Sequence, residues 1–99
     1  MSVRKSEEFI ADVERQYEWY VTKAGEDVAE RYLDAVKATC HLLGQHPQLG
    51  PLGQFTHPRL REWRFFVVFP PFKKHVLFFE VVGGEVLMRR ALHGHRNLP

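Results

Sequence analysis

The sequence predicts an α+β domain, in which an N-terminal strand and a helical hairpin pack on one face of a small antiparallel sheet (β-α-α-β-β-β). Three observations predict this fold class. Two consecutive segments in the first half repeat apolar residues at helical spacing, and a link of three residues joins them. The second half alternates apolar and polar residues around a Gly-Gly pair. A chain of 99 residues predicts a single domain, residues 1–99.

The first helix is predicted over residues 7–22, after a short edge strand at residues 2–5. Ser6 is a suitable N-cap, and Glu7 and Glu8 follow in the first turn, where the helix dipole favours anions. Its apolar face carries Phe9, Ile10, Val13, Tyr17, Tyr20 and Val21. Its solvent face is predicted to carry Asp12, Glu14, Arg15, Glu18 and Lys23.

The second helix is predicted over residues 26–43, because Gly25 interrupts the first pattern and Gly44 with Pro47 ends the second. Cys40 lies on its apolar face and is expected to be a packed core thiol. Residues 45–58 contain three prolines and two glycines and are predicted to form a loop. A strand is predicted over residues 59–69, ending at Pro70-Pro71 because proline lacks the amide that a ladder requires.

A β-hairpin is predicted from the apolar runs 76–82 and 86–92, with Gly83-Gly84 as its two-residue turn. This register places Leu77 opposite Arg90 and leaves Glu80 and Arg89 diagonally opposed on the other face. The core face is expected to carry Leu77, Phe79, Val81, Val86, Met88 and Leu92.

Arg90 is the exception on that apolar face, because an unpaired buried charge is costly. Two interpretations stay open: a rim guanidinium that grips phosphate or carboxylate, or a structural ion pair.

Charge is divided unevenly along the chain. Residues 1–50 carry six Lys/Arg and nine Asp/Glu, whereas residues 51–99 carry eight and three. A basic second half favours an anionic partner, such as nucleic acid, a nucleic-acid enzyme or an acidic peptide. One cysteine, no signal-peptide pattern and no long apolar run favour a soluble, cytoplasmic protein without membrane contact.

The chain closes on a motif that reads Leu77-Phe78-Phe79, then Arg90-Ala91-Leu92-His93-Gly94-His95-Arg96-Asn97. This motif resembles that of the ParE/RelE superfamily of type II toxin–antitoxin toxins, and the ParE branch most closely. Phe79 replaces the family's usual tyrosine and Asn97 its usual aspartate. Further pieces follow in family order: Ala24-Gly25, the Pro47 to Gly50 spacing, and Leu60-Arg61.

The resemblance implies a plasmid-stabilisation type of toxin that inhibits DNA gyrase without catalysis and is neutralised by a cognate antitoxin. The predicted target-binding residues are Arg61, Arg64, Arg90, His93 and Arg96. Four aromatic residues are candidates for antitoxin binding, with core packing as the alternative: Trp19, Tyr20, Trp63 and Phe72. A homodimer or a toxin–antitoxin hetero-oligomer is a further expectation.

Two alternatives come from other classes. A RelE-like, ribosome-dependent mRNA endoribonuclease would need proton-transfer groups and cations at the phosphate. The residues that would supply them are His93 or His75, with Arg61, Arg64, Lys73, Arg90 and Arg96. The absence of tyrosine after Tyr32 disfavours this chemistry. The second alternative is a non-toxic module that binds an antitoxin. No cofactor is expected, and His93 with His95 make a poor metal signature.

Overall fold

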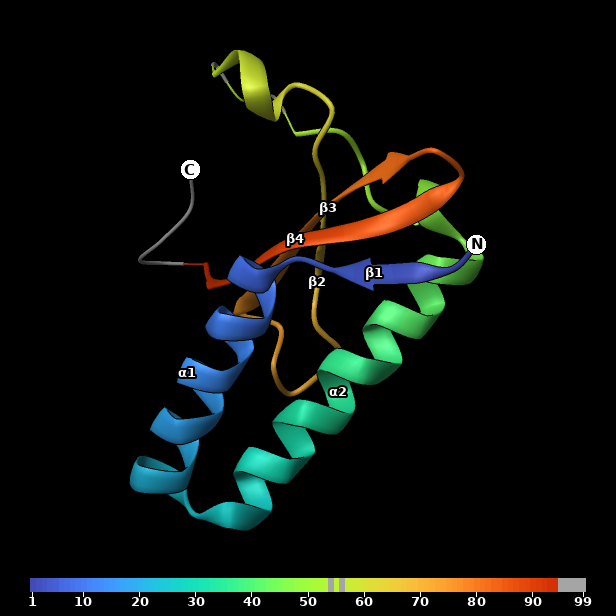
Figure 1. Cartoon of the computed structure of the whole chain (residues 1–99). Helices are drawn as coiled ribbons and strands as arrows, with labels where there is room; N and C mark the ends of the chain where they lie inside the picture. Colours follow the sequence, from blue (N-terminus) through green and yellow to red (C-terminus); the bar gives the residue numbers. More distant parts are fainter. Residues whose placement is uncertain (54, 56, 95–99) are drawn as a thin grey trace.

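The computed structural model describes residues 1–53, 55 and 57–94, and shows two helices beside a sheet (Figure 1). The helices are α1 (Glu7–Ala24) and α2 (Glu26–Gln45). Two short 3-10 turns follow, η1 (Pro47–Leu49) and η2 (Pro58–Leu60). The strands are β1 (Val3–Lys5), β2 (Arg64–Val67), β3 (His75–Val82) and β4 (Glu85–His93).

The four strands form one mixed sheet in the order β1-β4-β3-β2. β2, β3 and β4 are antiparallel neighbours, whereas β1 runs parallel to β4. The α+β class and the packing of a helical hairpin on a sheet are therefore confirmed. The first strand makes the sheet mixed, because it joins the last strand in the same direction.

The helix boundaries follow the predicted signals closely. The Ser6 hydroxyl accepts a hydrogen bond from the Phe9 amide at 3.1 Å, as expected of an N-cap. Gly25 joins the helices with a φ of 97°, a backbone conformation that favours glycine. Both helices end two residues later than predicted, at Ala24 and Gln45.

The predicted strand over residues 59–69 is too long at both ends, because β2 covers only Arg64–Val67. Pro58–Leu60 forms η2, and the Trp63 amide donates to the Leu60 carbonyl at 3.1 Å, so the chain turns before pairing begins. Proline fixes φ near the value of a turn, which alternation of side chains does not reveal. The strand itself spans four residues, and the η2 segment projects from the domain (Figure 1).

The hairpin turn forms as predicted, with positive φ at Gly83 and Gly84. Its register holds from Val82–Glu85 to Phe79–Met88, and then a β-bulge inserts one residue into β4. Beyond the bulge Phe78 faces Arg90 and Leu77 faces Ala91, so the predicted Leu77–Arg90 pair is wrong. Pattern reading assumes a regular ladder, and a single inserted residue breaks that assumption.

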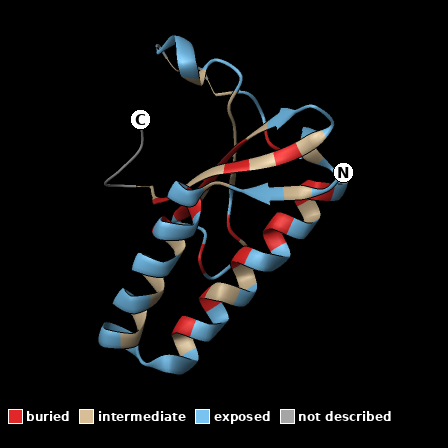
Figure 2. Ribbon diagram, in the orientation of Figure 1, coloured by how far each residue is buried: buried red, intermediate tan, exposed pale blue. Residues whose placement is uncertain are grey.

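The core lies between the sheet and the helical hairpin, where buried residues line the facing sides (Figure 2). Leu77, Phe79, Val86 and Met88 are fully buried, as predicted. Val81, near the end of β3 at the hairpin turn, is 39% exposed, so its predicted place in the core is wrong. Cys40 is a buried core thiol, and burial raises its pKa to about 11.

Candidate functional site

The buried carboxylate of Asp12 joins α1 to β4, because it binds Arg90, the charged residue predicted on the apolar face of the hairpin. Asp12 Oδ2 accepts from Arg90 Nε at 2.7 Å and from the Ala91 amide at 3.0 Å, and Oδ1 accepts from Arg90 Nη2 at 3.0 Å. Arg15 Nη1 adds a contact of 3.3 Å to Oδ1. The hydrogen bond to Asp12 raises the pKa of the Arg90 guanidinium.

Asp12 is 3% exposed, so its predicted place on the solvent face of the helix is wrong. The bulge in β4 provides the reason, because it brings the Ala91 amide and the Arg90 side chain toward α1. Between the two interpretations of Arg90, the structure shows the ion pair. A role of Arg90 in target binding stays a prediction.

A histidine pair lies at the open end of the β3–β4 hairpin, away from the Gly83-Gly84 turn. His75 and His93 face each other across β3 and β4, with ring centroids 5.2 Å apart. His75 is 3% exposed, and its Nε2 lies 2.7 Å from the Tyr20 hydroxyl of α1. Burial, followed by the nearby His93, lowers the pKa of His75 to about 4. The neutral imidazole therefore packs as part of the core at physiological pH.

The sheet face away from the helices, called the outer face here, carries a second paired arginine, Arg89. Arg89 Nε lies 3.3 Å from Glu80 Oε2, which confirms the predicted diagonal ion pair. The Arg89 guanidinium carbon also lies 5.2 Å from the centre of the Trp63 ring, a cation–π contact that the sequence did not predict. Beneath them Phe78 is buried against Phe55 and Trp63.

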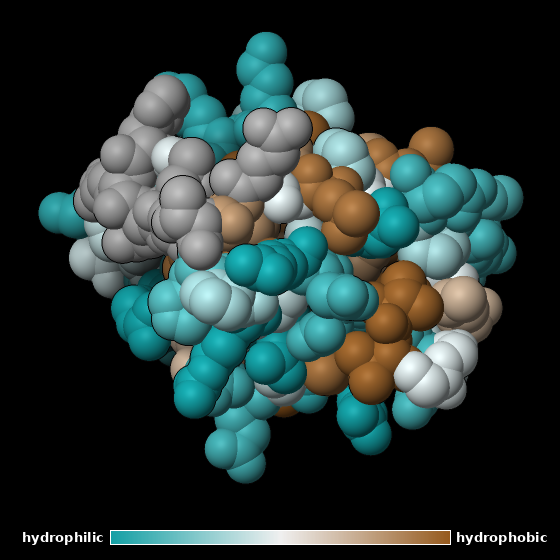
Figure 3. Space-filling model, turned by 90° about the horizontal axis from the view of Figure 1, so that it is seen from above, coloured by the Kyte–Doolittle hydropathy of each residue, from teal (hydrophilic) through white to brown (hydrophobic). Residues whose placement is uncertain are grey.

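The outer face is mixed in character. Figure 3 views the end of the molecule away from the α1–α2 link, where hydrophobic side chains form separate groups among hydrophilic ones. Val67 of β2 is 45% exposed, and the Arg89 side chain keeps 37% of its surface in water. Such a surface offers cations and apolar contacts together, as protein-binding surfaces do.

The other predicted target-binding residues are dispersed. Arg61 follows η2 and is exposed, whereas Arg64 Nη1 donates to the Gly50 carbonyl at 2.8 Å. Arg90 and His93 are engaged by Asp12 and His75 respectively. Arg96 lies outside the described residues. The four predicted residues that the structure describes therefore form two pairs. Arg61 and Arg64 lie near the start of β2, and Arg90 and His93 lie toward the end of β4.

The four aromatic candidates for antitoxin binding divide in the same way. Phe72 is 6% exposed, and Tyr20 packs against it in an edge contact, 5.6 Å between centroids. Both belong to the core region, as the packing alternative expected. Trp19 is 45% exposed, and Trp63 is half-buried beneath Arg89. These last two residues retain surface for a partner.

Within residues 1–53, 55 and 57–94, no group of three His, Cys, Asp or Glu side chains is placed to hold a metal ion. Over the same residues, no helix combines the length and apolar character needed to cross a bilayer.

A helical hairpin on one face of a mixed four-stranded sheet defines a small α+β domain, and its outer face bears Arg89 and aromatic rings. The sequence model of the "ParE toxin of type II toxin-antitoxin system, parDE" matches residues 3–98. The chain therefore belongs to the ParE toxin family.

A solved structure shares this fold. It is the chromosomal ParDE toxin–antitoxin system from P. aeruginosa, with a TM-score of 0.77 and 20% sequence identity, covering 94% of this chain and 95% of that one. A comparison with curated proteins gave no match.

Proposed function

We propose that this protein is a toxin that inhibits DNA gyrase by binding it, and that a cognate antitoxin neutralises it. The observation that carries the proposal is the family match, which spans residues 3–98. Gyrase inhibition is the activity implied by the resemblance to the ParE branch. The basic second half supports a partner with an acidic or nucleic-acid surface.

The contacts of the described residues favour binding over catalysis. An endoribonuclease would need free cations and a proton-transfer group at one phosphate. Two residues predicted for that role already have partners within the chain. Arg90 is hydrogen-bonded to Asp12, and the ring of His93 packs on His75. The exposed Arg61 and the half-exposed Arg89 keep surface accessible to a partner, which supports binding.

Supercoiling of relaxed plasmid by purified gyrase tests the target. We expect increasing amounts of the toxin to reduce supercoiling, and the purified antitoxin to restore it. Full supercoiling with toxin in large excess over gyrase would exclude gyrase as the target.

The same preparation, added to translating ribosomes, tests the endoribonuclease alternative. Cleavage of translated mRNA at defined codon positions, with gyrase unaffected, would replace the proposal. A chain that impairs neither process, nor the growth of a bacterial host when induced alone, would be a non-toxic module.

A further inference from the structure

The β3–β4 hairpin contains two ladders that differ in register by one residue. The first ladder joins residues 79–82 of β3 to residues 85–88 of β4, and the second joins residues 75–78 to residues 90–93. Arg89 is the residue that the bulge inserts into β4 between them. A hairpin without this bulge would continue the first ladder, so that every pair beyond it would shift by one residue. We call this alternative the continuous register.

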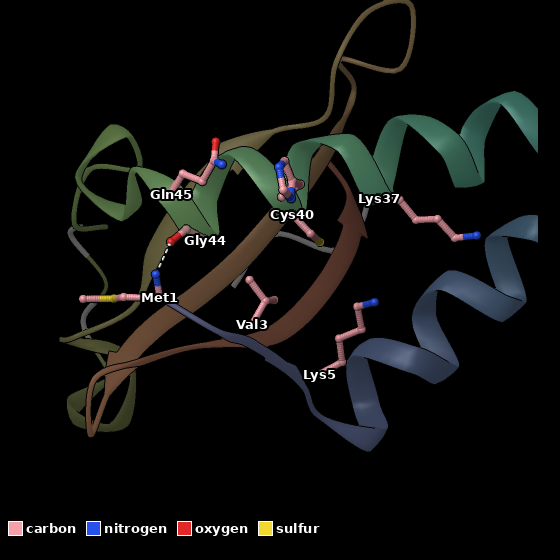
Figure 4. A pocket seen from close by; sticks show the side chains of 8 residues that line it. Met1, Val3, Lys5, Lys37, Cys40, Gly44 and Gln45 are labelled. Carbon is pink, nitrogen blue, oxygen red and sulfur yellow. Dashed lines mark hydrogen bonds between the residues drawn. The ribbon is translucent and has the colours of Figure 1, made fainter.

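β1 covers only the first part of β4. The two strands pair as far as Lys5 and Met88, and beyond Lys5 the chain turns into α1 (Figure 4). The start of α1 lies beside β4 (Figure 1), and the Ser6 amide donates to the Met88 carbonyl at 3.0 Å. From this point a helix, rather than a strand, is the neighbour of β4.

Two side chains, from α1 and its N-cap, hold the bulged backbone. The Ser6 hydroxyl donates to the carbonyl of Arg89 at 3.0 Å. Further along α1, Oδ2 of Asp12 accepts from the amide of Ala91, also at 3.0 Å. The backbone groups on both sides of Arg90 are therefore hydrogen-bonded to side chains of the helix.

The bond between Asp12 and Ala91 is buried. Asp12 is 3% exposed and Ala91 is 7% exposed, so water cannot readily replace this hydrogen bond. The same Oδ2 atom accepts from Arg90 Nε at 2.7 Å, so one carboxylate oxygen contacts two consecutive residues of β4. A shift of register that moved the Ala91 amide away from Asp12 would leave a buried amide without its acceptor.

The two registers place different side chains on the core face of β4. In the observed register Ala91 faces the fully buried Leu77, and His93 faces the buried His75. The continuous register would instead bring Leu92 opposite His75 and turn His93 to the outer face. The register therefore determines which side of the sheet carries His93.

The apolar pattern of β4 favours the continuous register. Val86, Met88 and Leu92 all occupy even-numbered positions, so a regular strand would place all three on the core face, with Arg90 as the exception. The structure has the bulged register instead. The hydrogen bonds from α1 are contacts outside the hairpin that reach the bulge itself.

We propose that Ser6 and Asp12 form a clamp that selects the bulged register of β4 over the continuous register. In this role they are positioning residues, because they keep His93 packed on His75 and away from the outer face. The inference goes beyond the proposed function. It concerns the free chain and depends on neither gyrase nor an antitoxin.

Replacement of the buried ion pair by apolar residues tests the clamp without leaving a charge unpaired. Asp12→Leu/Arg90→Leu removes the acceptor of the Ala91 amide. It also makes position 90 apolar, as the core face of the continuous register requires. Replacing a buried ion pair by apolar residues of similar volume is often neutral for stability, so this variant is expected to fold.

Cross-strand nuclear Overhauser effects in NMR spectra measure the register directly. Wild type is expected to show contacts of Leu77 with Ala91 and of His75 with His93. In Asp12→Leu/Arg90→Leu we expect contacts of Leu77 with position 90 and of His75 with Leu92 instead. The wild-type contacts in the folded double variant would overturn the proposal.

The matched control separates the clamp from the residue at position 90. Asp12→Asn/Arg90→Leu carries the same change at position 90 but keeps a side-chain oxygen that can accept from the Ala91 amide. We expect it to retain the wild-type contacts. The continuous register in this variant as well would assign the selection to position 90 and overturn the clamp.

A milder variant gives a result even if the double variant does not fold. Ser6→Gly removes the hydrogen bond to the Arg89 carbonyl, and glycine is nearly as good an N-cap as serine. We expect relaxation dispersion to show exchange between two registers at residues 75–78 and 90–93, and not at residues 79–82. Dispersion unchanged from wild type would overturn the clamp. None of these results bears on gyrase inhibition, which the supercoiling assay measures separately.

Discussion

Arg89 and Arg90 are neighbours at the bulge of β4, yet their guanidinium groups have different partners. Arg90 is bound on the helix side by the buried carboxylate of Asp12, through two hydrogen bonds. Arg89 lies on the outer face, between the ring of Trp63 and the carboxylate of Glu80, a partner with 20% of its side chain exposed. The two side chains themselves are similarly exposed, at 37% and 39%.

This difference shows that the partner, rather than the arginine, determines the structural role. A carboxylate that is 3% exposed cannot recover its hydrogen bonds from water, so the pair with Arg90 holds α1 to the sheet. A half-exposed pair gains little, because water and salt compete for both charges. Removing the partner of each arginine should therefore give very different losses of stability.

Asp12→Ala should give the largest loss. It leaves the Ala91 amide without its acceptor and Arg90 without its carboxylate, and we expect the free energy of unfolding to fall by about 3 kcal/mol. Urea denaturation followed by circular dichroism measures this change.

The matched control is Asp34→Ala, which removes an exposed aspartate from α2. Its effect should stay within about 0.5 kcal/mol. Equal losses for Asp12→Ala and Asp34→Ala would contradict the structural role assigned to the buried pair.

Lowering the pH should give the next loss of stability, through the buried His75 between the sheet and α1. His75 has a folded-state pKa of about 4, below its ordinary value of about 6.5, so the unfolded chain binds the proton more readily. The contribution of neutral His75 is complete above pH 7, declines as pH falls from about 6.5 to 4, and is lost below that range. We expect this to remove up to about 3 kcal/mol of stability.

Urea denaturation between pH 7.5 and pH 4 measures the decline, and two variants identify its source. His75→Gln should make the dependence on pH shallower. His41→Gln changes an exposed histidine on α2 and should leave it as in wild type. A slope that survives in His75→Gln would assign the acid sensitivity to other groups.

Arg89→Ala should have a smaller effect, because it removes a cation–π contact and one partly exposed ion pair. We expect a loss of about 1 kcal/mol, together with a change in Trp63 fluorescence. A double-mutant cycle with Glu80→Ala measures the ion pair itself. A coupling energy well above about 1 kcal/mol would show that the outer face is as structural as the helix side.

Sequence patterns predict the features of this chain that depend on local interactions. Local signals predicted both helices, the cap at Ser6 and the Gly-Gly turn, because each depends on neighbours within a few residues. The Glu80–Arg89 pair followed from hairpin register in the part of the ladder before the bulge.

The Asp12–Arg90 pair could not be predicted in this way. Its members are 78 positions apart, and Asp12 falls on the polar side of its helix by periodicity alone. One cue was present, since an arginine on an apolar face requires an acidic partner. The identity of that partner depended on a one-residue bulge and on the packing of α1, which no local pattern encodes.

Arg61→Ala should have the smallest effect on stability and the clearest effect on binding. Arg61 is exposed beyond η2, so its loss should change the free energy of unfolding by less than about 0.5 kcal/mol. If target binding uses the projecting segment, the concentration of toxin that halves gyrase supercoiling should rise severalfold, whereas Arg31→Ala, an exposed arginine on α2, should leave it unchanged. Asp12→Ala should show the opposite behaviour to Arg61→Ala. It should lower the free energy of unfolding, and it should weaken gyrase inhibition only under conditions in which the chain unfolds. Equal inhibition by Arg61→Ala, Arg31→Ala and wild type would exclude Arg61 from the target-binding surface and leave Arg89 as the next residue to test.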